Sequence, residues 1–162
     1  MIEEGILDAC SVINCINSDS LEVVLAIPGL SLGVGPIVRG ECGHDALEAM
    51  IASGRCRLLD DGALPAARFL ALLAQYGLGD GETECLVFGE AQQSLIVVTD
   101  DLAARRAVVN LLGDNRLTGS LGLLRRAVES GLIDGAEAMR SYERMKESGG
   151  FLPEISDKFF AV

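Results

Sequence analysis

The fold class is decided by the stretch Leu95-Ile96-Val97-Val98-Thr99-Asp100-Asp101. Its continuous apolar run predicts a central parallel strand that is covered on both faces. The two acidic residues end this strand, and the pattern of residues 102–112 predicts a helix directly after it. A buried strand that leads straight into a helix indicates an α/β domain.

Strands and helices are expected to alternate over the rest of the chain in the same way. Short strands are predicted near residues 5–7, 30–34, 55–59 and 116–118, with helices between them. The expected fold is therefore a three-layer α/β/α domain with a mostly parallel central sheet. We expect a single domain over residues 1–148 and a C-terminal tail over residues 149–162.

The charge of the chain is high and uneven. The 162 residues carry a formal net charge of −11, and 49% of them are hydrophobic, which is enough for a core. Residues 1–100 hold 4 arginines and 15 acidic residues, whereas residues 101–162 hold 9 basic and 9 acidic residues. This excess of acid argues against a protein that grips nucleic acid by bulk charge, because neutralising phosphates requires Lys and Arg.

The cysteine and histidine content excludes several kinds of site. The five cysteines form no CxxC pair, and His44 is the only histidine. A structural zinc site needs four suitably spaced ligands, and a catalytic triad would depend on that one histidine. The acidic N-terminus is unlike a signal peptide, and no apolar run approaches the ~18 residues of a membrane span. We therefore expect reduced cysteines and a cytoplasmic location.

Acidic residues follow the predicted strands. Asp8 ends the first strand, and Asp100 and Asp101 end the central one. In open parallel sheets, ligand sites form beyond the carboxyl ends of the strands. Asp8 is notable because no helix cap is expected to explain an acid at the end of a buried strand, and Ser11 adds a hydroxyl one turn later.

Three further acids are expected near these strand ends. Glu41 lies in the helix that should begin at Pro36, and Glu82 and Glu84 lie in the first turn of a helix that Asp80 is expected to cap. Capping is the ordinary alternative role for acids at helix starts. As a set, however, these oxygen-only ligands suit Mg²⁺ or Mn²⁺, and such ions support phosphate chemistry.

The same residues resemble a PIN domain, the PilT N-terminus nuclease fold used by VapC-type toxins. The resembling segments are Ile6-Leu7-Asp8-Ala9-Cys10-Ser11, Gly35-Pro36-Ile37-Val38-Arg39-Gly40-Glu41, residues 81–86, residues 95–107 and residues 118–124. The last three are similar to the G-E-x-E, D-D-x-x-A-R-R-A and T-G-S/T-L-G segments of an uncharacterised branch of the family.

The resemblance implies a metal-binding quartet. It would consist of Asp8, Glu41, one of Glu82 or Glu84, and one of Asp100 or Asp101. Glu82 is favoured over Glu84 when Asp100 aligns with the acid at the strand end, whereas a Thr-x-Asp alignment favours Asp101, so this second choice stays open. The catalytic set with Asp100 is Asp8, Glu41, Glu82 and Asp100.

The resemblance also suggests supporting residues. Ser11 and Thr99 are candidates to hydrogen-bond a carboxylate or a metal-bound water. Arg105, with Arg106 beside it, is a candidate to approach a phosphate, although arginines on a helix commonly form a solvated face. Ser120 lies at a predicted helix N-terminus, where an anion could bind.

The implied activity is that of a ribonuclease dependent on Mg²⁺ or Mn²⁺, an endonuclease that cleaves RNA phosphodiester bonds with metal-activated water. The resemblance permits a role as the toxin of a VapBC-type toxin–antitoxin pair, with an antitoxin protein as partner and a homodimer as the expected assembly. The alternative is a PIN-fold interaction module with little activity, which would bind a basic partner through its acidic N-terminal part.

Overall fold

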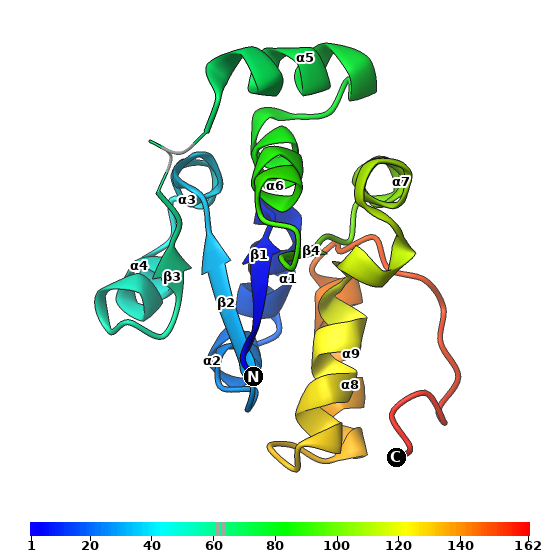
Figure 1. Ribbon diagram of the computed structural model, residues 1–162. Helices are drawn as coiled ribbons and strands as arrows, with labels where there is room; N and C mark the ends of the chain where they lie inside the picture. Colours follow the sequence, from blue (N-terminus) through cyan, green and yellow to red (C-terminus); the bar gives the residue numbers. More distant parts are fainter. Residues whose placement is uncertain (61, 63) are drawn as a thin grey trace.

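Five parallel strands form the centre of the molecule, in the order β3-β2-β1-β4-β5 (Figure 1). The structure is a computed structural model that describes residues 1–60, 62 and 64–162. The strands are β1 (Glu3–Leu7), β2 (Leu30–Val34), β3 (Arg57–Leu58), β4 (Ile96–Val98) and β5 (Leu117–Thr118). Every pairing between them is parallel in the described part of the chain.

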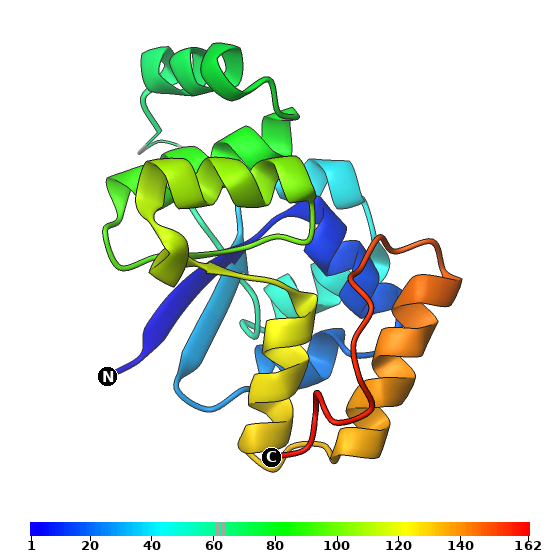
Figure 2. The same cartoon turned by 90° about the vertical axis from the view of Figure 1, so that its right-hand side faces the viewer.

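Helices cover both faces of the sheet, which makes the three-layer α/β/α fold that the sequence predicts. The helices are α1 (Ala9–Asn17), α2 (Leu21–Leu25), α3 (Pro36–Cys42), α4 (Asp45–Ala52), α5 (Ala66–Tyr76), α6 (Asp80–Ala91), α7 (Leu102–Leu112), α8 (Ser120–Glu129) and α9 (Gly135–Glu147), with a short 3₁₀ helix, η2 (Asp114–Arg116). Helices α6 and α7 lie on one face, and α1, α2, α8 and α9 lie on the other (Figure 2). Helix α5 is outermost and packs on α6 (Figure 1).

The core confirms that β4 is a central strand. Its three residues are buried, and it pairs with β1 on one side and β5 on the other. Ile6 and Leu7 of β1 are fully buried beside it. The continuous apolar run around β4 therefore reflects cover by helices on both faces, as expected for a parallel strand.

Some boundaries differ from the expected ones. The strand predicted over 55–59 is reduced to the two-residue edge strand β3, and the apolar stretch from Leu95 contributes only three residues to β4. Asp80 is the first residue of α6 and Gly79 is its N-cap, so the expected cap is displaced by one residue. No helix among the described residues combines the length and apolar character needed to cross a membrane.

The buried carboxylate of Glu84, in α6, is hydrogen-bonded to the start of α3 and holds the two helices together. The Glu84 side chain is fully buried and accepts hydrogen bonds from the backbone N–H groups of Ile37 and Val38, at 2.8 and 3.2 Å. These donors belong to the first turn of α3, where a negative charge is favoured by the helix dipole. Gly35 makes room for this contact, because a Cβ there would lie 2.0 Å from Glu84 Oε1.

We expect Gly35→Ala to lower the free energy of unfolding by about 1–3 kcal/mol, because the new methyl group displaces a buried, hydrogen-bonded carboxylate. Gly40→Ala is the matched control, because Gly40 lies in α3, the helix that Gly35 caps, and a Cβ there would meet nothing within 4 Å. That control should be neutral or stabilising by up to about 1 kcal/mol, since Ala is the better helix former. Urea unfolding of both variants measures the difference, and equal stabilities would show that the contact does not hold α3 in place.

Candidate functional site

The candidate site lies where the strand order changes direction. The chain moves from β1 to β2 on one side, whereas β4 and β5 lie on the other side of β1. The carboxyl ends of β1 and β4 are therefore neighbours at a topological switch point, the usual place for a site in an open parallel sheet. The Asp8 N–H donates to the Val98 carbonyl at 3.1 Å, which holds the two ends together.

Asp8 is buried at this point, and each of its carboxylate oxygens accepts a hydrogen bond. Its side chain is 1% exposed and caps α1, because Oδ1 accepts from the Ser11 N–H at 2.9 Å. Oδ2 accepts from the Thr99 hydroxyl at the end of β4. The expectation that no cap would explain Asp8 was wrong, since the helix begins immediately after the strand. A helix cap does not need to be buried, so capping alone does not explain the position of Asp8. Burial raises the pKa of Asp8 to about 6, and the negative charge of Asp100 adds to this shift. The hydrogen bonds from Thr99 and Ser11 act in the opposite direction.

Asp100 joins three elements through its carboxylate. Oδ1 accepts from the Ser120 N–H at 2.8 Å, and Oδ2 accepts from the Ser120 hydroxyl and from Asn14 Nδ2, the latter at 2.8 Å. Asp100 is 8% exposed. The N-terminus of α8 thus binds an anion, as anticipated for Ser120, but the anion is the carboxylate of this chain's own Asp100.

Asn14 was not among the residues singled out from the sequence. It lies one turn after Ser11 on α1, it is 4% exposed, and its side chain reaches across to Asp100. The only signal in the sequence was the spacing of a polar residue three positions after Ser11, on the face that should be buried. A buried polar side chain inside a helix requires a partner, and the sequence does not reveal that partner.

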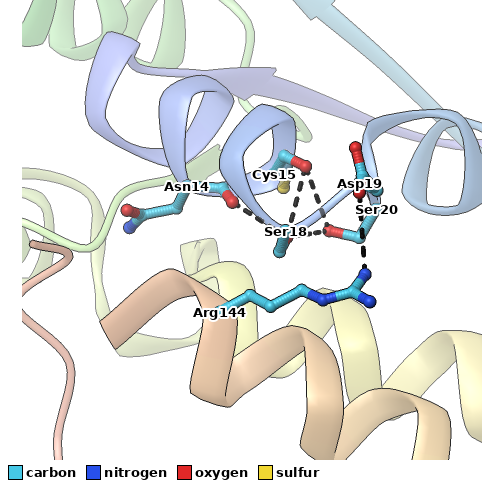
Figure 3. Close-up of polar contacts among 6 residues, drawn as sticks. All are labelled: Asn14, Cys15, Ser18, Asp19, Ser20 and Arg144. Atoms are coloured by element: carbon cyan, nitrogen blue, oxygen red, sulfur yellow. Dashed lines mark hydrogen bonds and ion pairs between the residues drawn. The ribbon is translucent and has the colours of Figure 1, made fainter. Parts of the chain in front are cut away.

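Polar contacts at its C-terminal end also fix α1 in position (Figure 3). The Ser18 hydroxyl donates to the carbonyls of Asn14 and Cys15 at 2.9 and 3.2 Å and lies 2.7 Å from the Ser20 hydroxyl. Asp19 forms an ion pair with Arg144 of α9, 3.6 Å apart. The helix that carries Asn14 is therefore tied down at both ends.

Two glutamates lie at the N-terminus of α6. Glu41, from α3, accepts from the Gly81 N–H at 3.0 Å, and Glu82 accepts from the Gly79 N–H at 3.1 Å. The pKa of Glu82 is raised, first by burial and then by the charges of Asp101 and Glu41, despite the hydrogen bond from Gly79. These two side chains therefore lie within electrostatic reach of each other and of the end of β4.

The thiol of Cys10 indicates that the acids surround a common region. Burial raises its pKa to about 12, and the negative charges that add to this shift come from Asp8, Asp100, Asp101 and Glu82. All five cysteines are free. The structure thus gathers side chains that are up to 93 positions apart in the sequence, from Asp8 to Asp101, around the first turn of α1.

Other candidate residues have a clear structural task. The carboxylate of Glu84, a residue of α6, binds the first turn of α3, as described above. Asp101 caps α7 by accepting from the Ala104 N–H at 2.8 Å. Arg105 donates to the carbonyls of Thr99 and Thr118, at 2.8 and 3.4 Å, and so ties β4 to β5. Arg106 is exposed.

The carboxylates of the centre form no ion pair with another described residue. In the part of the chain that the structure describes, no Lys or Arg forms an ion pair with the acids discussed here. These acids are Asp8, Glu41, Glu82, Asp100 and Asp101. Buried charges ordinarily require a partner of opposite charge. A bound cation would reduce the repulsion between these neighbouring carboxylates.

The donor chemistry fits Mg²⁺ or Mn²⁺, because carboxylate oxygens are the ligands that these hard cations prefer. No group of three or more His, Cys, Asp or Glu side chains within residues 1–60, 62 and 64–162 is arranged to hold an ion by itself. Mg²⁺ is usually bound through one or two carboxylates, with waters and substrate phosphates as its other ligands. Asp8 and Asp100 are close enough to interact and would supply such a pair.

The structure is an α/β/α domain with buried carboxylates at its switch point. Comparison with known proteins identifies its family. Residues 41–158 match a family model described as a PIN domain. The chain belongs to the PIN domain family. Its fold is a nuclease-type fold, and PIN nucleases typically use divalent metals. Comparison with curated proteins and with solved structures gave no match.

The family match has consequences for the sequence predictions. It includes Glu41, Glu82 and Asp100, whereas Asp8 and Ser11 precede it. Assignment to the particular branch with the G-E-x-E segment stays a prediction, as does the division at residue 148. The match itself continues to residue 158, into the predicted tail.

The burial of Asp8 leads to a pH-dependent stability. The pKa of Asp8 rises from 3.8 to about 6 on folding, so the folded state binds the proton more tightly than the unfolded state. Protonated Asp8 therefore favours the folded state, and this contribution to the free energy of unfolding is lost as pH rises from about 4 to about 6. We expect Asp8→Asn to be more stable than wild type in EDTA at neutral pH, by up to about 3 kcal/mol, with the difference vanishing below about pH 4.

Urea unfolding across this pH range measures the effect. Asp157→Asn, at an exposed aspartate, is the control and should not change stability by more than about 0.5 kcal/mol. An Asp8→Asn variant that is less stable than wild type at neutral pH would contradict a buried, uncompensated charge.

Proposed function

We propose that this protein is a divalent-metal-dependent ribonuclease that cleaves RNA phosphodiester bonds internally. Asp8, Glu41, Glu82 and Asp100 are the proposed metal-binding and catalytic residues. The observation that supports the proposal best is the pair of buried carboxylates at the switch point, Asp8 and Asp100, neither of which forms an ion pair with a described Lys or Arg. Family membership supports the same chemistry.

The roles of the residues follow from their contacts. When bound, Mg²⁺ or Mn²⁺ supplies an activated water and neutralises charge on the phosphate under attack. Asp8 and Asp100 would hold the ion through oxygens that keep lone pairs after their hydrogen bonds are made. Thr99 and Ser11 orient Asp8, and Asn14 and Ser120 orient Asp100, so the carboxylates need little rearrangement to bind.

The contacts also favour one residue of each pair that the sequence left open, Glu82 or Glu84 and Asp100 or Asp101. Both oxygens of Glu84 accept amide hydrogen bonds at the start of α3, so Glu82, which is partly exposed, is the proposed ligand. Asp101 caps α7, whereas Asp100 is buried in the network with Asn14 and Ser120. Asp100 is therefore the proposed aspartate.

The first test is a metal titration followed by cleavage assays. We expect Mn²⁺ to raise the melting temperature of wild type and to leave that of Asp8→Asn unchanged. When the free ion exceeds its Kd about 100-fold, the stabilisation of wild type should amount to about 2.7 kcal/mol. Cleavage of single-stranded and structured RNA should require the metal and fall by about 100-fold or more in Asp8→Asn and Asp100→Asn. DNA of the same sequence tests the preference for RNA. Cleavage that persists in EDTA and in Asp8→Asn would overturn the mechanism.

A second test separates the two glutamates of α6. Glu82→Gln preserves the capping contact with Gly79, because Gln also serves at this position, so stability in EDTA should change little while the metal-induced stabilisation falls. Glu84→Gln should instead lower stability by about 1–3 kcal/mol, because an NH₂ group replaces an acceptor that faces N–H donors. Thermal unfolding of both variants with and without Mn²⁺ makes the comparison. The opposite pattern would assign the metal to Glu84.

A toxin role with an antitoxin partner, and a homodimeric assembly, stay predictions. Size-exclusion chromatography with light scattering tests the homodimer directly. Growth arrest on expression that is lost in Asp8→Asn would support the toxin role.

A further inference from the structure

A cavity of about 500 Å³ adjoins the acidic centre on the side of β5 and α8. Its volume lies within the range of about 300–1,000 Å³ that is typical of small-molecule sites. Apolar side chains from three parts of the chain form most of its wall. They include Leu102, Leu117, Leu121, Phe151, Ile155 and Phe159.

The C-terminal segment, residues 149–162, forms one wall of this cavity and is fastened to the domain. The Tyr142 hydroxyl of α9 donates to the Pro153 carbonyl at 2.7 Å, and Phe160 is 2% exposed within the core. Phe159 lies edge-to-face against Phe160 with ring centroids 5.0 Å apart, and the Arg125 guanidinium lies 5.7 Å from the Phe159 centroid. The cavity wall is therefore built in advance of any ligand.

The cavity opens beside the proposed catalytic carboxylates. Asp100 contributes to its lining, together with Leu102, the first residue of α7, and Arg105. Arg105 is held by the carbonyls at the ends of β4 and β5, so its charge is fixed within reach of this edge. A ligand in the cavity would lie next to any phosphate bound at Asp100.

The two charged residues that line the cavity, Asp100 and Arg105, balance each other. The Arg125 guanidinium lies beside the Phe159 ring, so a second cation adjoins the aromatic part of the wall. Phe151 is 78% exposed at the cavity and presents a ring on which a flat group can stack. An RNA strand combines phosphates, which an arginine can approach, with flat bases whose faces stack on aromatic rings.

We propose that this cavity binds one unstacked base of the RNA strand, adjacent to the phosphate that is held at the acidic centre. The inference rests on the proposed ribonuclease function and names the part of the substrate that the site recognises. Phe151 and Phe159 provide the stacking surface, and Arg105 lies on the path of the backbone between the cavity and Asp100.

The experiment measures binding without cleavage. Fluorescence anisotropy in EDTA and at low ionic strength compares labelled RNA octamers of A, C, G or U with an abasic octamer that has the same backbone. Wild type should bind at least one base-bearing octamer about 5- to 10-fold more tightly than the abasic one, as expected for stacking on a single ring. Phe151→Ala and Leu102→Ala should remove that difference, and Phe151→Tyr should retain it.

The controls separate this effect from folding and from bulk charge. Leu70→Ala removes a leucine that is 63% exposed on α5, outside the cavity, and so matches Leu102, which is 53% exposed; it should leave binding unchanged. All variants should melt at the wild-type temperature. Equal binding of abasic and base-bearing octamers by wild type would overturn the proposal. RNA binding that Phe151→Ala leaves unchanged would also overturn it, and this is the result expected if the cavity binds a protein segment instead.

The two proposals fail in different ways. Metal-dependent cleavage by wild type that is unaffected by Phe151→Ala would leave the ribonuclease standing and reject the base site. Base-dependent binding in EDTA without cleavage under any metal would support the base site and reject the ribonuclease.

Discussion

The parallel pairing of β1 with β4 is the contact on which the site depends. Residues 5–7 of β1 pair with residues 96–98 of β4 although about 90 positions separate them in the sequence. The pairing brings the two strand ends into register, so that Asp8 and Asp100 follow adjacent strands at the switch point. Thr99, which donates to Asp8 and lies next to Asp100, completes the link between the two acids.

The acidic residues around this pairing serve two purposes at once. Asp8 and Asp101 cap helices, and Asp100 accepts from the N-terminus of α8, so each is stabilised by the N–H groups that a helix start leaves unpaired. These contacts supply only partial positive charge. Burial still raises the pKa of Asp8 to about 6, which means that hydrogen bonds do not fully offset the loss of water. Helix starts thus hold the carboxylates in place, and a cation would complete the neutralisation.

The sequence predicts the fold class and the order of the acids because both depend on local patterns. The apolar run before Asp100 identifies the central strand, and acids that follow strands are visible without knowledge of the fold. Contacts between distant residues are not predictable in this way. The bond from Asn14 to Asp100 and the lock of Glu84 on α3 depend on how helices pack. Strand and helix can also meet without a loop, which is why the cap formed by Asp8 was missed.

The ion pairs of the acidic half of the chain lie away from the carboxylate centre. Each of the four arginines in residues 1–100 pairs with a glutamate away from the centre. These pairs are Arg39–Glu48, Arg55–Glu22, Arg57–Glu4 and Arg68–Glu90. Glu3, also in the acidic half, pairs with Arg126 at 2.6 Å. The four arginines of residues 1–100 are thus engaged in ion pairs away from the centre. Arg105 donates to the carbonyls of Thr99 and Thr118. The carboxylates that the proposed function assigns to a bound cation are ones that lack an ion pair with any described residue.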